Sequence, residues 1–221
     1  MTAIEINEVS KTYGSVNALK NISLNLPANK VIAIVGASGA GKTTLLQVLS
    51  TLEKPDQGKI VHFGKDISTL KGKSLANYRN QGIGFVFQFH QLLPEFTAHE
   101  NVCLPGYLGR QSKKEVEAYA TELLNSFGLA SRLNHKPDEL SGGEKQRVAV
   151  ARALINKPKI IFADEPSGNL DSGNAEALHK LFFDLKDKLN CTFVVVTHNR
   201  TLANQADLCI SLKDGAIEKN D

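Results

Sequence analysis

Continuous apolar runs rich in β-branched residues recur along the chain. Such runs are typical of strands that are buried on both faces of a sheet. Residues 31–35 form such a run, and further strands are predicted at residues 59–63, 83–87, 160–163, 193–196 and 208–212. Helix-like segments at 43–52 and 175–189 separate several of them, and this alternation predicts crossovers and a largely parallel sheet. Residues 3–35 also read as strands joined by turns, before the first of these helices.

The pattern becomes helical between residues 97 and 156. Apolar side chains recur there every three or four residues, as in Val116, Tyr119, Leu123 and Phe127, and Gly128 is a plausible C-cap. We therefore predict one α/β domain spanning 1–221. Residues 1–96 and 157–221 form its core, with antiparallel strands at the N-terminus, and residues 97–156 form a helical subdomain.

A glycine-rich segment follows the strand at 31–35 and opens a helix, which is the context of a phosphate-binding loop. Backbone N–H groups at a helix N-terminus bind phosphate, and glycines let the backbone come close to it. Lys42 is expected to reach the terminal phosphates and the Thr43 hydroxyl to ligate Mg²⁺. The predicted nucleotide-binding residues are Gly36, Ala37, Ser38, Gly39, Ala40, Gly41, Lys42, Thr43 and Thr44.

Two adjacent carboxylates, Asp164 and Glu165, end the apolar run at 160–163. A buried strand seldom ends on two acids, because a desolvated charge needs a counter-charge. Beside a phosphate-binding loop, Mg²⁺ is the expected counter-charge for Asp164. Glu165 is then placed to polarise an attacking water as general base.

A second anion site is predicted at residues 140–144, Leu-Ser-Gly-Gly-Glu, ahead of an amphipathic helix at 148–155. Ser141 and the N–H groups near Gly142 and Gly143 would lie at the positive end of that helix. One chain with one terminal phosphate has no use for two such sites. A head-to-tail dimer, in which each chain covers the other chain's nucleotide, gives the second site a role.

With these motifs in this order, the sequence resembles the ABC ATPases over essentially its whole length. The resemblance implies a P-loop NTPase fold, ATP and Mg²⁺ as ligands, a second copy of the chain and an integral membrane permease as partners. It also suggests roles for four further segments. Tyr13 resembles the aromatic residue that stacks on adenine, Gln88 the glutamine that links Mg²⁺ and water to the permease, residues 167–171 the D-loop, and His198 the switch histidine at the γ-phosphate.

Each of these residues has a structural alternative when taken alone. Tyr13 could simply pack, Gln88 could be polar surface, and His198 could cap a strand end. Their order and spacing relative to the two strong motifs favour the functional interpretation. Glu165, His198, Lys42 and Gln88 are accordingly the predicted catalytic residues, and Thr43, Gln88 and Asp164 the predicted metal ligands.

Residues 88–101, 132–140 and 163–171 resemble the LolD-type ATPases of lipoprotein-releasing systems more particularly. This resemblance implies a LolC/LolE-like permease and a peripheral position on the cytoplasmic face of a bacterial inner membrane. MacB-type exporters, with a MacB-like permease, and FtsE-type cell-division ATPases are the alternatives. Four apolar residues in the first segment could pack inward or form a groove for a permease helix; they are Phe89, Leu92, Leu93 and Phe96.

Composition narrows the remaining classes of function. A net charge of +3 is too small to favour nucleic acid as a partner. No apolar stretch is long enough to span a membrane, and the N-terminus has no signal-peptide pattern, so we expect no direct membrane insertion. Cys103, Cys191 and Cys209 are predicted to be buried free thiols in a reducing compartment. No guanine-reading motif supports a GTPase, and a small-molecule kinase has no use for Leu-Ser-Gly-Gly-Glu. A non-transport ABC ATPase is a less favoured alternative, because such proteins usually carry coiled-coil insertions, zinc modules or tandem cassettes, and this chain has one cassette.

Overall fold

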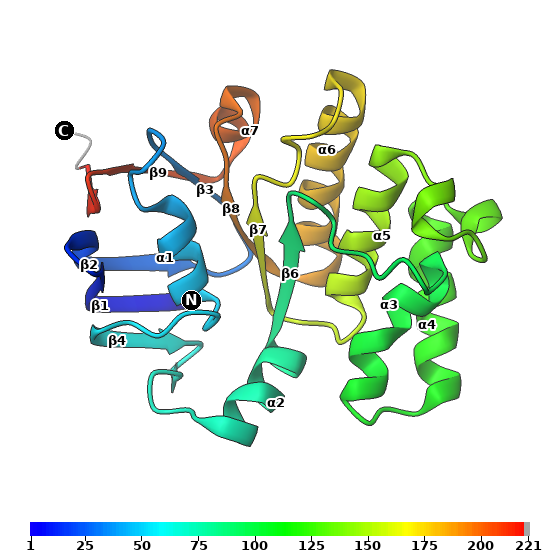
Figure 1. Cartoon of the computed structure of the whole chain (residues 1–221), viewed down its shortest axis with the longest axis horizontal. Helices are drawn as coiled ribbons and strands as arrows, with labels where there is room; N and C mark the ends of the chain where they lie inside the picture. The colour runs from blue at the N-terminus through cyan, green and yellow to red at the C-terminus, as the bar shows by residue number, and fades with distance from the viewer. Residues whose placement is uncertain (219–221) are drawn as a thin grey trace.

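The computed structural model describes residues 1–218 and contains two sheets with helices between and beside them (Figure 1). The strands are β1 (Thr2–Tyr13), β2 (Val16–Pro27), β3 (Val31–Val35), β4 (Gln57–His62), β5 (Lys65–Asp66), β6 (Ile83–Phe87), β7 (Ile160–Asp164), β8 (Thr192–Val196), β9 (Leu208–Lys213) and β10 (Ala216–Ile217). The helices are α1 (Lys42–Leu49), α2 (Gly72–Gly82), α3 (Ala98–Leu108), α4 (Lys113–Ser126), α5 (Gly142–Leu154), α6 (Ser172–Leu189) and α7 (Arg200–Gln205).

The central sheet has the strand order β10-β9-β3-β8-β7-β6. The pairs β9–β3, β3–β8, β8–β7 and β7–β6 are parallel, and only the short β10 is antiparallel. Successive residues of each strand face opposite sides, so Val31 and Val195 join one apolar cluster and Ile32 and Val194 join the other. Burial on both faces explains the unbroken apolar runs, and the prediction of a mostly parallel core is confirmed.

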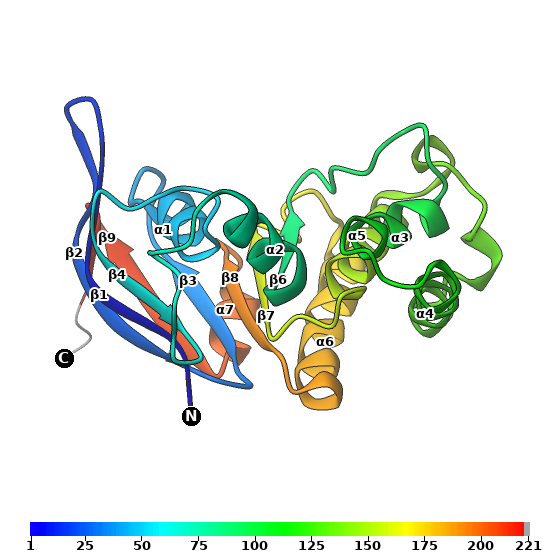
Figure 2. The same ribbon diagram turned by 90° about the horizontal axis from the view of Figure 1, so that it is seen from below.

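The second sheet is antiparallel, with the order β2-β1-β4-β5. Helix α1 lies between it and the central sheet, as Figure 2 shows from below. The side chains of Leu45, Leu46 and Leu49 on α1 are completely buried in the cluster shared by the two sheets. The predicted antiparallel N-terminal strands are therefore confirmed, and their sheet closes the core over the helix that follows the glycine-rich loop.

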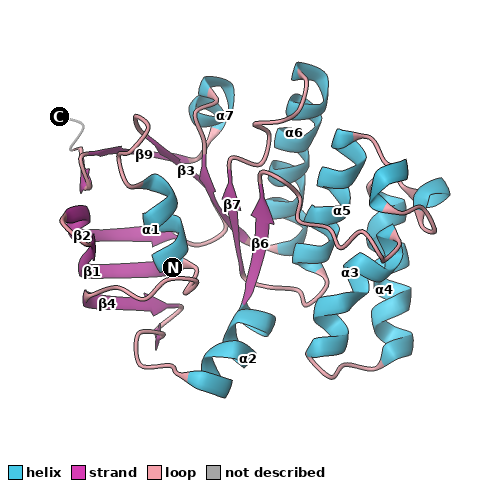
Figure 3. Ribbon diagram, in the orientation of Figure 1, coloured by secondary structure: helices cyan, strands magenta, loops and turns pink. Residues whose placement is uncertain are grey.

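Helices gather at the opposite side of the molecule from the antiparallel sheet (Figure 3). Residues 98–154 contain α3, α4, α5 and two short 3-10 turns and no strand. Val150 and Leu154 of α5 share an apolar cluster with Ile161 of β7, so α5 connects the helices to the sheet. Within residues 1–218, no helix has the length and apolar character that a membrane crossing requires.

Several predicted boundaries were wrong. The helix after Leu140 begins at Gly142 and not at residue 148, because Ser141 and Glu144 form a capping box that starts it earlier. Helix α1 ends at Leu49 and not at residue 52, where Ser50 serves as C-cap. The C-cap of α4 is Phe127, and the predicted C-cap Gly128 follows it one position later with a φ of 73°. The prediction that all three cysteines are buried was also wrong, because Cys209 is exposed.

Helices α2 and α7 were not predicted. Helix α2 buries none of its residues, so its sequence has no apolar stripe to reveal it. Helix α7 has only six residues, and Leu202 is its one buried side chain. The N-cap Asn199 accepts a hydrogen bond from the backbone N–H of Leu202 through its side chain. Both are helices whose formation depends on neighbouring structure more than on a pattern in the sequence.

His62 gives the fold a measurable dependence on pH. It is 2% exposed and its Nδ1 lies 2.8 Å from the hydroxyl of Tyr78. Burial lowers the pKa of His62 from 6.5 to about 4. The neutral form is favoured in the fold, so its stabilising contribution is present above pH 6.5 and is lost as the pH falls towards 4.

We predict that the unfolding free energy of the wild type falls by about 1 kcal/mol more than that of His62→Gln between about pH 7 and about pH 5.5. Glutamine does not titrate in this range, which removes the contribution of this one group. Urea unfolding at the two pH values measures the difference. Parallel pH profiles for the two proteins would contradict the assignment.

Candidate functional site

The register of four parallel strands brings the predicted site residues to one edge of the central sheet. Ile34 of β3 is paired with Val196 of β8, Val196 with Asp164 of β7, and Asp164 with Phe87 of β6. The segments that follow these residues leave the sheet side by side. Ligands of open α/β sheets bind at this carboxyl edge.

The glycine-rich loop between β3 and α1 adopts backbone conformations that favour glycine. Gly36, Gly39 and Gly41 have φ values of 151°, 79° and 99°. A Cβ on Gly36 would collide with the carbonyl oxygen of Leu212, and one on Gly41 with that of Ala18. The loop therefore wraps tightly over the N-terminus of α1, where free N–H groups can bind phosphate.

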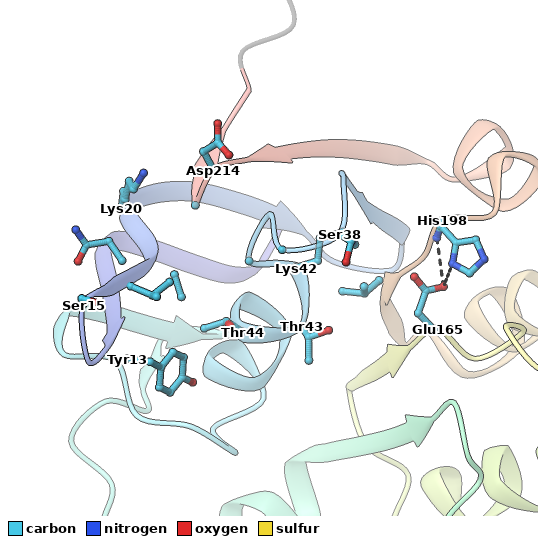
Figure 4. Close-up of a pocket in the computed structure, with 17 residues that line it drawn as sticks. Tyr13, Ser15, Lys20, Ser38, Lys42, Thr43, Thr44, Glu165, His198 and Asp214 are labelled. Carbon is cyan, nitrogen blue, oxygen red and sulfur yellow. Dashed lines mark hydrogen bonds and ion pairs between the residues drawn. The ribbon is translucent and has the colours of Figure 1, made fainter.

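A cavity of about 1080 Å³ lies beside this loop (Figure 4). Lys42 lines it and donates from Nζ to the carbonyl oxygens of Gly36 and Ala37, both at 2.9 Å. Ser38, Gly39, Gly41, Thr43 and Thr44 line the same cavity. The loop thus places a lysine charge and a helix N-terminus at one wall of a space large enough for a nucleotide.

The side chains of Asp164 and Thr43 contact each other. The Thr43 hydroxyl donates to Oδ1 of Asp164 over 3.3 Å. Burial raises the pKa of Asp164, the charge of Glu165 raises it further, and the Thr43 hydroxyl opposes the rise. A partly desolvated carboxylate beside a hydroxyl is an oxygen donor set that fits Mg²⁺, and a cation would relieve the unfavourable burial of the charge.

Glu165 and His198 form a contact at the other end of the cavity, shown by the dashed lines in Figure 4. Nδ1 of His198 lies 2.8 Å from Oε2 of Glu165, and the backbone N–H of His198 donates to the same oxygen over 3.2 Å. The Glu165 backbone has a φ of 45°, so the chain turns sharply as it leaves β7. The carboxylate is thereby held by His198, in the segment after β8, while it faces the cavity.

Tyr13 lies on the far wall of the cavity from this pair, at the end of the β1–β2 hairpin (Figure 4). Its side chain is 45% exposed, and Nζ of Lys11 lies 5.1 Å from the centre of its ring. A flat aromatic surface at this position can stack on a base. The hairpin also supplies lining residues that the sequence did not single out, namely Ser15, Val16, Asn17, Ala18 and Lys20.

No motif in the sequence marks this part of the wall. Val16, a β-branched residue shortly after Tyr13, is 63% exposed in the structure. Asp214 and Gly215, in the turn between β9 and β10, complete the wall and carried no motif in the sequence. Only the folded hairpin and turn bring these residues to the cavity.

Gln88 is placed one strand away from the cavity, after β6. Its side-chain Nε2 donates to Oδ1 of Asn169 over 3.4 Å, and Asn169 donates in return from Nδ2 to the backbone oxygen of Gln88 over 3.3 Å. The structure thus brings Gln88 to the segment after Glu165, and Gln88 is not among the residues that line the cavity beside Thr43. Asn169 is a contact of the site that the sequence motifs alone did not pair with Gln88.

Ser141, Gly142 and Gly143 form the N-terminus of α5, and none of them lines the cavity beside Lys42 within residues 1–218. Glu144 accepts from the N–H of Ser141 and from Nε of Arg132. The Ser141 N–H bond and the Arg132 bond lower the pKa of Glu144 to about 2. These hydrogen bonds stabilise the N-terminus of α5, which lies away from the phosphate loop of its own chain.

Comparison with known proteins identifies the family. The family model described as ABC transporter matches residues 19–168. The lipoprotein-releasing system ATP-binding protein LolD of Bacteroides thetaiotaomicron is 54% identical over 98% of this chain and 100% of its own length. The LolD protein of Porphyromonas gingivalis is 49% identical over 97% of this chain and 98% of its own.

The chain belongs to the ABC transporter family, with the LolD-type ATP-binding proteins. Solved structures agree with this assignment. A dimeric ATP-binding cassette in a post-hydrolysis state with ADP and Pi has a TM-score of 0.90 at 39% identity and covers 99% of this chain and 97% of its own. A dimeric bacterial ABC transporter cassette has a TM-score of 0.89 at 41% identity, over 98% of this chain and 97% of its own.

Membership of the ABC family confirms the predicted fold and activity: the chain is an ATPase that binds ATP. The high identity to LolD proteins over the whole chain does not favour the MacB-type and FtsE-type alternatives.

The four apolar residues after Gln88 differ in how far they are buried. Leu92 packs against the core, whereas Phe89, Leu93 and Phe96 are 73%, 44% and 36% exposed.

We predict that Gly36→Ala and Gly39→Ala differ sharply, although both lie in the same loop. Nothing lies within 4 Å of a Cβ on Gly39, so that variant is destabilised only by its φ of 79°, about 1 kcal/mol. Gly36→Ala meets the Leu212 carbonyl as well and is destabilised by about 3 kcal/mol or more, with weakened ATP binding. Denaturant unfolding and ATP titration measure both effects. Equal losses in the two variants would contradict the geometry of the loop.

Proposed function

We propose that this chain is the nucleotide-binding subunit of a lipoprotein-releasing transporter. Two copies enclose two ATP molecules and drive an integral membrane permease of the LolC/LolE type at the cytoplasmic face of a bacterial inner membrane. The observation that carries the proposal is the division of the site: the chain has a complete phosphate cradle and a second helix N-terminus that faces elsewhere. Its LolD relatives support lipoprotein release as the work done.

The second helix N-terminus is the basis for the dimer. In the proposed arrangement, Ser141, Gly142 and Gly143 of one protomer cover the γ-phosphate held by Lys42 of its partner. The positive N-terminal end of a helix favours a phosphate there. Gly143 has no space for a side chain on its own side, because a Cβ would collide with Oδ1 of Asn174. The dimeric state of the similar cassettes supports this arrangement.

The proposed chemistry is attack of water on the γ-phosphorus. Lys42 binds the β- and γ-phosphate oxygens, and Thr43 and Asp164 would hold Mg²⁺, with Gln88 approaching after the dimer closes. When bound, Mg²⁺ neutralises charge on the phosphate oxygens. Glu165 takes a proton from the attacking water through its free carboxylate oxygen, while the bond from the γ-phosphorus to the bridging oxygen breaks. His198 keeps the carboxylate in place through its 2.8 Å contact and can reach the γ-phosphate from there.

Tyr13 is proposed to stack on adenine at the other end of the cavity.

The Gln88–Asn169 pair offers a physical route for the proposed coupling between the permease and ATP hydrolysis. Gln88 precedes the exposed apolar residues, and Asn169 belongs to the loop that follows Glu165. A permease helix that seats on the apolar residues would therefore act on the segment that carries the base. Release of the γ-phosphate would open the dimer again, in the manner of nucleotide switches.

We predict that Glu165→Gln retains ATP binding but lowers kcat by about 100-fold or more, because glutamine cannot accept the proton. The variant should accumulate as an ATP-bound dimer. ATP titration, steady-state phosphate release and light scattering with size-exclusion chromatography measure these properties. Turnover at the rate of the wild type would exclude Glu165 as the base.

We predict that Leu93→Asp abolishes stimulation of ATP hydrolysis by the reconstituted permease and leaves the hydrolysis by the isolated chain unchanged. A charge at this exposed position disrupts an apolar contact with a partner but no core packing. Leu189→Asp is the matched control, since Leu189 is 42% exposed at the C-terminal end of α6, compared with 44% for Leu93. Equal stimulation of Leu93→Asp and the wild type would show that the permease binds elsewhere.

A further inference from the structure

A buried histidine contacts the loop that follows Glu165. His179 on α6 is 2% exposed, and its Nε2 lies 3.0 Å from the hydroxyl of Ser167, which is 8% exposed. A buried pair of this kind holds two segments in one relative position, because either partner alone would be left unsatisfied. Neither side chain belongs to the set that lines the nucleotide cavity.

The segment that this bond holds begins at the proposed base. The N–H of Gly168 donates to the carbonyl oxygen of Glu165 over 3.0 Å, which closes a turn, and the N–H of Leu170 donates to the Ser167 carbonyl over 3.2 Å. Glu165 itself has a left-handed φ of 45°, a conformation that surrounding contacts must maintain in a residue with a Cβ. Ser167 is the member of this turn whose side chain is anchored in the interior.

His179 also adjoins the segment that follows His198. Together with Thr201 and Gln205 of α7 it lines a cavity of about 500 Å³ between α6 and α7. Helix α7 begins two residues after His198, with Asn199 as its N-cap. One side chain of α6 therefore touches the turn after Glu165 and lies beside the helix after His198, the two residues that contact each other at 2.8 Å.

Burial favours the neutral form of this histidine. Desolvation lowers the pKa of His179, and only the charge of Glu176 opposes the effect. Its Nδ1 has no hydrogen-bond partner among residues 1–218. Apolar side chains at both positions would fill this space without leaving a polar atom unpaired, so the pair of His179 and Ser167 is better explained by the geometry that it imposes than by stability.

We propose that His179 is a positioning residue for ATP hydrolysis. Its hydrogen bond to Ser167 fixes the Glu165–Gly168 turn and thereby keeps the Glu165 carboxylate against His198 and facing the water. Small displacements of a catalytic group reduce turnover strongly and substrate binding little, since binding depends on the phosphate loop. The inference rests on the proposed role of Glu165 as base.

The test compares Ser167→Ala, His179→Met and the double variant, using the full-length chain and MgATP. Each single variant should lower kcat by about 10-fold with KM changed by less than about twofold, and the double variant should be no worse than either single one. His179→Gln, whose side-chain amide can still bond to the Ser167 hydroxyl, should recover most of kcat. Tm is measured for every variant, and assays are run well below it.

The matched control is Tyr78→Phe. It removes the hydroxyl of the other buried histidine–hydroxyl pair, His62 and Tyr78, at 2.8 Å. That pair touches neither Glu165 nor its turn, so the control should lower Tm without lowering kcat. A comparable fall of kcat in Tyr78→Phe, independent additive losses in the double variant, or normal kcat in both single variants would overturn the proposal.

Assaying Glu165→Gln in parallel distinguishes a failure of the base assignment from a failure of the positioning role of His179. If Glu165→Gln is inactive while Ser167→Ala and His179→Met turn over normally, the base assignment survives and the role of His179 is refuted. If Glu165→Gln is itself active, the base assignment fails and the positioning role fails with it.

Discussion

The register of the central sheet is the constraint on which the site depends. Four adjacent parallel strands, β3, β8, β7 and β6, end at the same edge, so the phosphate loop, His198, Glu165 and Gln88 leave the sheet next to one another. A shift of one strand by a single residue would reverse which side chains face each apolar cluster. The packing that stabilises the core therefore also fixes the relative positions of the residues at its edge.

The sequence predicted most of what depends on local pattern. Unbroken apolar runs marked the strands, and loops with special backbone requirements marked the phosphate cradle. The sequence could not predict the features that depend on contacts between segments far apart in the chain. The pairing of Gln88 with Asn169, the cavity wall formed by Val16 and the bond of His179 to Ser167 join residues from different elements, and no single motif contains them. Helix α2, which buries none of its residues, lay equally beyond pattern analysis.

In the proposed function, one chain provides two unlike halves of a phosphate site, and they lie in different places. The cradle beside Lys42 is lined on one side by α1, while the N-terminus of α5, where Ser141 and Gly142 are exposed and Gly143 is buried, belongs to the helical side of the molecule. The Glu165 carboxylate is held against His198, and the capped N-terminus of α5 is bound to Arg132, by contacts within the chain. Such preorganisation suits catalysis by positioning, provided that a second copy brings the two halves together.

Complementation between two inactive variants tests this division most directly. Lys42→Ala removes the cradle lysine and Ser141→Ala alters the covering helix end, so each homodimer has two defective sites. A mixed dimer has one intact site, with Lys42 from one chain and Ser141 from the other. We predict that an equal mixture regains up to about a quarter of wild-type ATPase activity, because half of the dimers are mixed and each has one intact site of two. Mixed activity no greater than the sum of the separate proteins would contradict it.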